Sequence, residues 1–198
     1  MKEKKRMNRN LVFIGMPAVG KSTVGIVVAK RLGMGFVDTD LLIQDQEKKL
    51  LREIIAEAGL DGFLKIENQV NAGVNVRNSV ISPGGSVIYC ADAMEHYKKI
   101  GTVVYLKASY QTIKRRIRNP KKRGVVLREG QSLRDLYEER VPYFEKYADI
   151  TVCVDGNRIE DTIKNVLDEV NNYKKTTEKR KNLTESWVKT KIIIRSEP

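Results

Sequence analysis

Nine residues from Gly15 to Thr23 have the composition and spacing of a phosphate-binding loop. Their sequence, Gly-Met-Pro-Ala-Val-Gly-Lys-Ser-Thr, matches the pattern GxxxxGK[ST] at every fixed position. In such a loop, backbone N–H groups surround the phosphates of a nucleotide, a lysine reaches the β- and γ-phosphates, and a hydroxyl binds Mg²⁺. We therefore expect ATP and Mg²⁺ here. The loop residues that we assign to the nucleotide are Gly15, Ala18, Val19, Gly20, Lys21, Ser22 and Thr23.

The residues on either side of the loop predict the elements that must position it. The four apolar residues 11–14 indicate a buried strand, and the apolar residues at 24, 27, 28 and 32 recur at helical spacing. Strand, loop and helix therefore follow in the order of a phosphate site, with the positive end of the helix directed at the anion. The alternative is a glycine-rich turn without a ligand, which does not require this order.

An acidic pair, Asp38 and Asp40, follows a short apolar step at residues 36–37. At the end of a strand, side chains two residues apart point to the same face. Such a pair suits hydrated Mg²⁺ on one carboxylate and a substrate hydroxyl on the other. A helix N-cap at Asp40, before the apolar residues 41–43, is an equally good interpretation.

Two further segments are candidates for ligand contact. Pro83-Gly84-Gly85-Ser86 follows a buried-type strand at residues 79–82, and glycines at the end of a strand allow a ligand to approach the backbone. Residues 119–124 contain a proline, a glycine and three cations, which suits a mobile basic loop that closes over phosphates. A plain turn and a solvated loop remain the respective alternatives.

The order of the predicted elements indicates the fold class. Strands at 11–14, 79–82, 102–106 and 150–154 alternate with helices, which predicts an α/β protein with a parallel sheet between two helical layers. We expect one domain over residues 10–173, with a helical substrate-binding insertion at about 38–73 and a lid at about 118–131. The basic ends, 1–9 and 174–198, are expected to be disordered.

Charge and hydropathy exclude several classes of function. The net charge is +12, but nine of these charges lie in the two terminal segments, so a nucleic-acid partner is not expected. No apolar run approaches the roughly 20 residues that cross a bilayer. We expect a cytoplasmic monomer that acts on a small molecule.

The motifs together resemble those of the shikimate kinases. They are the phosphate loop, Asp-Thr-Asp at 38–40, Phe63 with Glu67, Val-Ile-Ser-Pro-Gly-Gly at 80–85, Lys-Arg-Gly-Val-Val-Leu at 122–127 and Glu-Arg-Val-Pro-Tyr-Phe at 139–144. The resemblance covers about residues 10–172. It implies a three-layer αβα P-loop fold like that of nucleoside monophosphate kinases. It also implies transfer of the ATP γ-phosphate to shikimate, in aromatic amino acid biosynthesis. Gluconate kinases are similar at the loop but differ after it.

The resemblance also implies a role for individual residues. The catalytic residues it implies are Lys21, Asp40 and Arg123. Mg²⁺ would be bound by Ser22 directly and by Asp38 through water, while Arg116 and Arg123 would contact ATP. The substrate-binding residues it implies are Asp40, Gly84, Gly85 and Arg140, the last of which would hold the substrate carboxylate.

Three positions depart from the family pattern, all outside the phosphate loop. Where shikimate kinases have FRxxE, this chain has Leu64 in place of the arginine, with Lys65 about 100° further around the helix. The third glycine of the family's GGG is Ser86, and the proline of its lid motif is Gly124. Two alternatives therefore remain: a kinase for a different small hydroxylated acceptor, and a non-catalytic ATP-binding regulatory protein.

Overall fold

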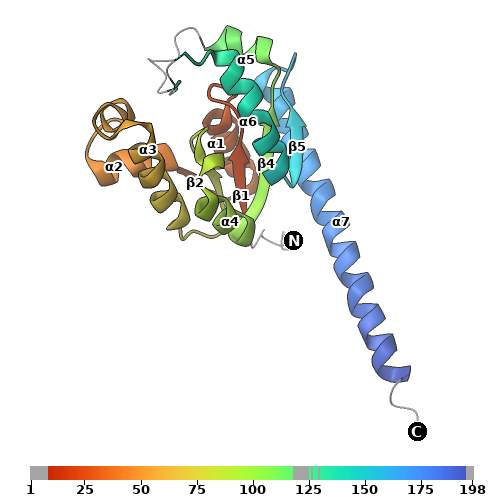
Figure 1. The fold of residues 1–198 in the computed structure, drawn as a ribbon. Helices are drawn as coiled ribbons and strands as arrows, with labels where there is room; N and C mark the ends of the chain where they lie inside the picture. Colours follow the sequence, from red (N-terminus) through yellow and green to blue (C-terminus); the bar gives the residue numbers. More distant parts are fainter. Residues whose placement is uncertain (1–8, 118–124, 126, 129, 195–198) are drawn as a thin grey trace.

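The centre of the molecule is a five-stranded parallel sheet with the strand order β2-β3-β1-β4-β5 (Figure 1). The computed structural model describes residues 9–117, 125, 127–128 and 130–194, and the side chains of those up to residue 180. The strands are β1 (Asn10–Ile14), β2 (Gly35–Asp38), β3 (Ser79–Ser82), β4 (Gly101–Lys107) and β5 (Ile150–Cys153). Every residue of β1 is buried, as expected for a parallel strand covered on both faces.

Strand β1 lies between β3 and β4, and this position determines where the phosphate loop lies. Leu11 is in register with Val80 of β3 and with Thr102 of β4. From β1 the chain moves past β3 to β2 at one edge of the sheet. From β3 it moves in the opposite direction, past β1, to β4. The loop after β1 therefore lies at a switch point of the sheet, where ligands bind outside the carboxyl ends of the strands.

Helices cover both faces of the sheet. They are α1 (Lys21–Leu32), α2 (Thr39–Glu47), α3 (Leu51–Ala72), α4 (Ala91–Ile100), α5 (Tyr110–Arg116), α6 (Leu133–Tyr147) and α7 (Ile159–Ile194), with a short 3₁₀ turn η1 (Val87–Tyr89). Right-handed crossovers that run in opposite directions place α1 on one face and α4 and α6 on the other. Helix α7 packs against α1 and β5. The expected three-layer architecture is confirmed.

The predicted helical insertion consists of α2 and α3, which lie to one side of the sheet (Figure 1). They have a small apolar cluster of their own, made by Ile43, Ile54 and Phe63. Gly59 interrupts α3 with a φ of 69°, in the left-handed region, so the helix bends there. The second half of α3 packs against α4 and η1 and thereby joins the insertion to the main domain.

The end of the chain differs from the sequence prediction. Instead of disorder after Tyr173, helix α7 continues to Ile194 and projects away from the sheet (Figure 1). Residues 159–194 contain neither glycine nor proline, and many are good helix formers, so the helix continues without an apolar face to bury. Despite its length, α7 has too many charged residues to cross a bilayer, and no other helix in the described residues qualifies.

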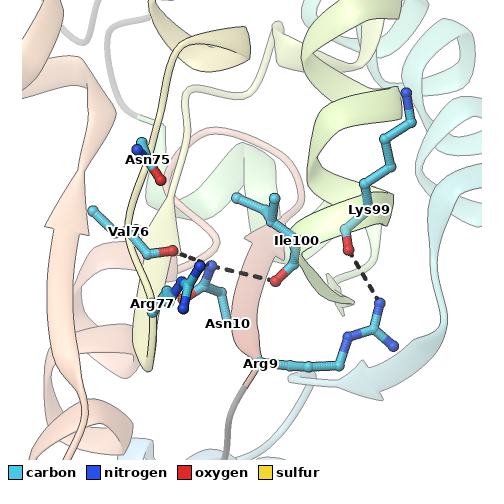
Figure 2. Close-up of a pocket in the computed structure, with 7 residues that line it drawn as sticks. All are labelled: Arg9, Asn10, Asn75, Val76, Arg77, Lys99 and Ile100. Carbon is cyan, nitrogen blue, oxygen red and sulfur yellow. Dashed lines mark hydrogen bonds between the residues drawn. The ribbon is translucent and has the colours of Figure 1, made fainter.

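A buried asparagine connects the amino ends of the strands, far from the phosphate loop. Asn10 is 2% exposed, and its amide nitrogen donates to the carbonyl oxygens of Val76 at 2.8 Å and Ile100 at 3.3 Å. Its side-chain oxygen accepts from the N–H of Ser79 at 3.0 Å. A pocket of about 340 Å³ lies here (Figure 2), lined partly by Arg9, which donates to carbonyl oxygens at the end of α4.

Replacing Asn10 by alanine is expected to lower the free energy of unfolding by about 2–4 kcal/mol, because buried backbone groups lose their partners. Urea unfolding of the full chain measures this difference. Asn75, which is exposed and lines the same pocket, is the matched control, and Asn75→Ala should have an effect below about 0.5 kcal/mol. Equal losses in the two variants would contradict the role of Asn10.

Candidate active site

The phosphate loop joins the carboxyl end of β1 to the amino end of α1. Gly15 has a φ of 146°, and a Cβ on it would lie 2.7 Å from the carbonyl oxygen of Leu106, so only glycine fits between the loop and β4. Gly20, the N-cap of α1, has a φ of 110°, and no side chain caps the first turn of the helix. The free N–H groups of that turn are therefore available to an anion, and the helix dipole favours one.

Lys21 is the first residue of α1, and its side chain folds back over the loop. Its Nζ donates to the carbonyl oxygens of Gly15 at 3.0 Å and Met16 at 3.3 Å. Burial lowers the pKa of Lys21 to about 8, an effect that the nearby carboxylate of Asp40 opposes. The ammonium group is thus held at the mouth of the loop, where the negative charge of phosphates would stabilise its protonated form.

Ser22, Asp38 and Ser82 come together beside the loop from three different elements. The hydroxyl of Ser22 donates to Asp38 Oδ2 at 2.7 Å and lies 3.2 Å from the hydroxyl of Ser82. Mg²⁺ in nucleotide sites takes few protein ligands and completes its shell with water and phosphate oxygens, so one hydroxyl and one carboxylate fit it. The described residues contain no larger group of three or more metal-binding side chains.

The acidic pair is arranged differently from the strand-end prediction. Asp38 is the last residue of β2 and the N-cap of α2, and its Oδ1 accepts from the N–H of Asp40 at 3.1 Å. Asp40 lies in the first turn of α2, so the helix rather than strand alternation directs its side chain. The cap is therefore Asp38, and Asp40 is left to face the cavity.

The Asp40 carboxyl is half-buried in that cavity. Burial raises its pKa to about 6, Lys21 counteracts the shift, and Asp38 adds to it. A carboxylate with a pKa near the working pH can accept a proton from a hydroxyl and still be ionised in a large fraction of molecules. Asp40 is therefore suited to orient or deprotonate an alcohol.

The cavity itself has a volume of about 350 Å³ and connects the phosphate loop with the helical insertion. One wall is the loop and the start of α1, and the other is built from α2, α3 and the turn after β3. The lining residues are Pro17, Ala18, Gly20, Lys21, Ser22, Thr23, Asp40, Leu51, Phe63, Glu67, Pro83, Gly84, Gly85 and Ser86. Its size and mixed polarity suit a small hydroxylated ligand next to a nucleotide's phosphates.

Arg140, predicted to hold a substrate carboxylate, lies behind Gly85. It is 3% exposed, its guanidinium carbon is 5.4 Å from the centre of the Tyr89 ring, and its Nε has no hydrogen-bond partner. A Cβ on Gly85 would lie 3.2 Å from Arg140 Nη1 and 2.8 Å from Pro17. A side chain at position 85 would therefore collide with Pro17 and press on this guanidinium, so glycine keeps the space between the cavity lining and Arg140 free.

A second pocket, of about 240 Å³, lies on the other side of the phosphate loop. Its walls come from the loop, α1, α5, the segment after β5 and α7, and it is lined by Ala18, Val19, Gly20, Thr23, Val24, Arg116, Val154, Asn157, Ile159 and Thr162. Arg116 Nη1 donates to the carbonyl oxygen of Val19 at 2.8 Å. The pocket is continuous with the phosphate loop through shared residues and is mostly apolar, as a base-binding pocket requires.

The structure places the predicted site residues outside the loop in different surroundings. Asp40, Gly84 and Gly85 line the cavity with the loop, and Asp38 lies beside it, bonded to Ser22. Arg140 lies behind Gly85, whereas Arg116 lines the second pocket. Arg123 and most of the predicted lid lie outside the described residues. Ser82 was not predicted as a site residue, and only its place at the end of the strand before Pro83 could have indicated it.

Comparison with known proteins agrees with this geometry. The family profile for shikimate kinase matches residues 17–171. A shikimate kinase from Chlorobium chlorochromatii is 35% identical over 179 residues, which cover 84% of this chain and 94% of the relative. A solved shikimate kinase from Acinetobacter baumannii, in complex with shikimate, superposes with a TM-score of 0.73 at 28% identity and covers 82% of this chain and 92% of its own. A gluconokinase from Sinorhizobium meliloti, at 16% identity and a TM-score of 0.60, shares the fold alone. The chain belongs to the shikimate kinase family.

Proposed function

We propose that this protein transfers the γ-phosphate of ATP to a hydroxyl of shikimate, giving shikimate 3-phosphate and ADP. The observation that carries the proposal is that the Asp40 carboxyl and the phosphate loop with Lys21 line one cavity. An acceptor hydroxyl at Asp40 would therefore face the terminal phosphate of a nucleotide in the loop. Membership of the family and the shikimate bound by its Acinetobacter relative support shikimate as the acceptor.

The roles of the residues follow from their positions. Asp40 binds the attacking hydroxyl and accepts its proton as the new P–O bond forms, and Lys21 stabilises the negative charge of the transferring group. Ser22 and Asp38 would hold Mg²⁺, which neutralises charge on the phosphates when bound. Catalysis consists mainly of positioning the two reactants and neutralising charge, since the phosphoryl group passes directly between them.

The remaining residues bind the two substrates. Arg116 would lie against the adenine of ATP in the second pocket, and Arg123, which is outside the described residues, would contact ATP. Gly84 and Gly85 present their backbone to the shikimate ring, and Arg140 binds the carboxylate past Gly85. A monomeric state and a cytoplasmic location remain predictions.

An ADP-release assay with ATP, Mg²⁺ and shikimate, compared with the same mixture without shikimate, tests the proposed function. We expect turnover that depends on shikimate at sub-millimolar concentrations. Background ADP release from a chain that still binds ATP would show that the acceptor is wrong. Failure to bind ATP would contradict the proposal that this protein is a kinase.

The second candidate is a kinase for another small hydroxylated acceptor, and Leu64 is the observation that favours it. Leu64 is half-buried and packs against the main apolar core, and Lys65 is exposed and does not line the cavity. The arginine missing at position 64 is therefore not replaced by its neighbour. A hydrogen bond to a charged group contributes about 1.5–3 kcal/mol. Without the arginine's bond to the substrate carboxylate, the preference for a carboxylated acceptor is expected to be weaker than in a chain that has the arginine.

Replacing Leu64 by arginine is expected to increase discrimination in favour of a charged carboxylate. The ratio of kcat/KM for shikimate to that for its neutral methyl ester should rise about 10- to 150-fold, which corresponds to one restored charged hydrogen bond. Coupled assays with both acceptors measure the ratio. Lys65→Arg, which adds a guanidinium at the exposed neighbouring position, is the control and should leave it unchanged; an equal rise in both variants would contradict the assignment.

A further inference from the structure

Glu67 is a buried carboxyl in the part of α3 that departs from the family pattern. In that pattern the glutamate follows the arginine of FRxxE, and here the arginine is Leu64. Glu67 is 0% exposed, and none of the ion pairs found among the described residues includes it. Its Oε1 has no hydrogen-bond partner. A buried carboxyl oxygen without a hydrogen-bond partner lowers the free energy of unfolding, because it loses its bonds to water without replacing them. Such an oxygen therefore requires an explanation.

The free oxygen of Glu67 faces the acceptor side of the cavity. A Cβ on Gly84 would lie 2.5 Å from Glu67 Oε1 and 2.9 Å from Asp40 Oδ1, so both oxygens converge on the open face of this glycine. Both carboxyls also line the cavity. They come from different helices, α3 and α2, and only the missing side chain of Gly84 keeps the space between them open.

The surroundings of Glu67 leave this one oxygen for a ligand. Cys90 Sγ lies 4.0 Å from Glu67 Oε2, whereas Oε1 has no hydrogen-bond partner. Burial raises the pKa of Glu67 to about 7 and the nearby Asp40 adds to the shift, while Ser86, Arg140 and Lys21 oppose it. A carboxyl that titrates near neutrality can accept a hydrogen bond from a hydroxyl when ionised or donate one when protonated.

We propose that Glu67 binds a second hydroxyl of the acceptor directly, beside the hydroxyl that Asp40 orients. This inference rests on the proposed function and specifies its substrate class: the recognised element is a pair of hydroxyls on neighbouring carbons. Because Leu64 cannot form an ion pair with Glu67, the carboxyl is available to the acceptor. Recognition in this chain thus depends more on the hydroxyls of the acceptor and less on its carboxylate.

The test compares Glu67→Ala and Glu67→Gln with the wild-type chain, using shikimate and analogues that each lack one ring hydroxyl. With shikimate, Glu67→Ala should raise KM about 10-fold or more, because a hydrogen bond to a charged group is lost. With one of the analogues, the same substitution should change KM less than about 3-fold, because the bonded hydroxyl is already absent. KM for ATP should stay constant. Glu57→Gln, at an exposed position on α3, is the matched control.

The comparison between acceptors separates direct binding from positioning. If Glu67→Ala raises KM equally for shikimate and for every analogue, Glu67 only supports the turn at Gly84 and the inference is overturned. If the alanine variant does not fold, the same comparison with Glu67→Gln, which keeps the shape of the side chain, decides. A wild-type chain without shikimate-dependent turnover would instead overturn the proposed function, so the two failures are distinguishable.

Discussion

Replacing Asp40 by asparagine is expected to lower kcat with shikimate about 10²- to 10⁴-fold, the usual contribution of a general base. Asparagine keeps the shape of the side chain and can still hold a hydroxyl, but it cannot accept the proton that leaves during attack. Asp40 makes no contact with the nucleotide pocket around Arg116, so KM for ATP should change little. Steady-state kinetics with each substrate varied in turn measure both quantities.

The control for this experiment lies on the same helix. Asp45 is an exposed residue of α2 that pairs with Lys48, and Asp45→Asn should leave kcat unchanged. A large fall in kcat in both variants would indicate damage to α2 rather than loss of a base. Unchanged turnover in Asp40→Asn would remove Asp40 from the mechanism.

Replacing Lys21 by methionine is expected to lower kcat about 10²- to 10³-fold. This is the usual effect of removing one hydrogen-bond donor that stabilises the charge developing in the transition state. Methionine keeps much of the length of the apolar stem but cannot donate to a phosphate. The affinity for ATP should also fall, since the ammonium lies at the mouth of the loop, where it donates to Gly15 and Met16. Turnover assays and calorimetric titration with ATP measure the two effects.

The matched variant for Lys21 is at the other end of α1. Lys30 is exposed in the last turn of that helix, and Lys30→Met should alter neither kcat nor ATP binding. If Lys21→Met binds ATP normally and retains its turnover, the phosphate loop does not act through this lysine. The contrast between the two variants also excludes a general effect of removing one positive charge.

Most elements of the fold could be predicted from local sequence patterns. The strand at 11–14 and the loop after it were predictable because a parallel strand buried on both faces is continuously apolar and the loop pattern has fixed spacing. The continuation of α7 beyond Tyr173 was not predicted, because the sequence there has no apolar face, and helix propensity without burial is a weak signal. The turn from β2 into α2 was also misjudged, because N-capping by Asp38 depends on a backbone change within two residues.

The sequence by itself determined the phosphate chemistry, because a phosphate loop is a contiguous motif whose backbone geometry its own glycines and the following helix create. Only the tertiary structure decided how the acceptor side is built. Asp40, Glu67 and Gly84 lie far apart in the chain and converge because α2, α3 and the turn after β3 pack together. The place of Arg140 behind Gly85 depends likewise on the packing of α6 against η1. Such contacts arise from side-chain packing between distant segments, which no local spacing encodes.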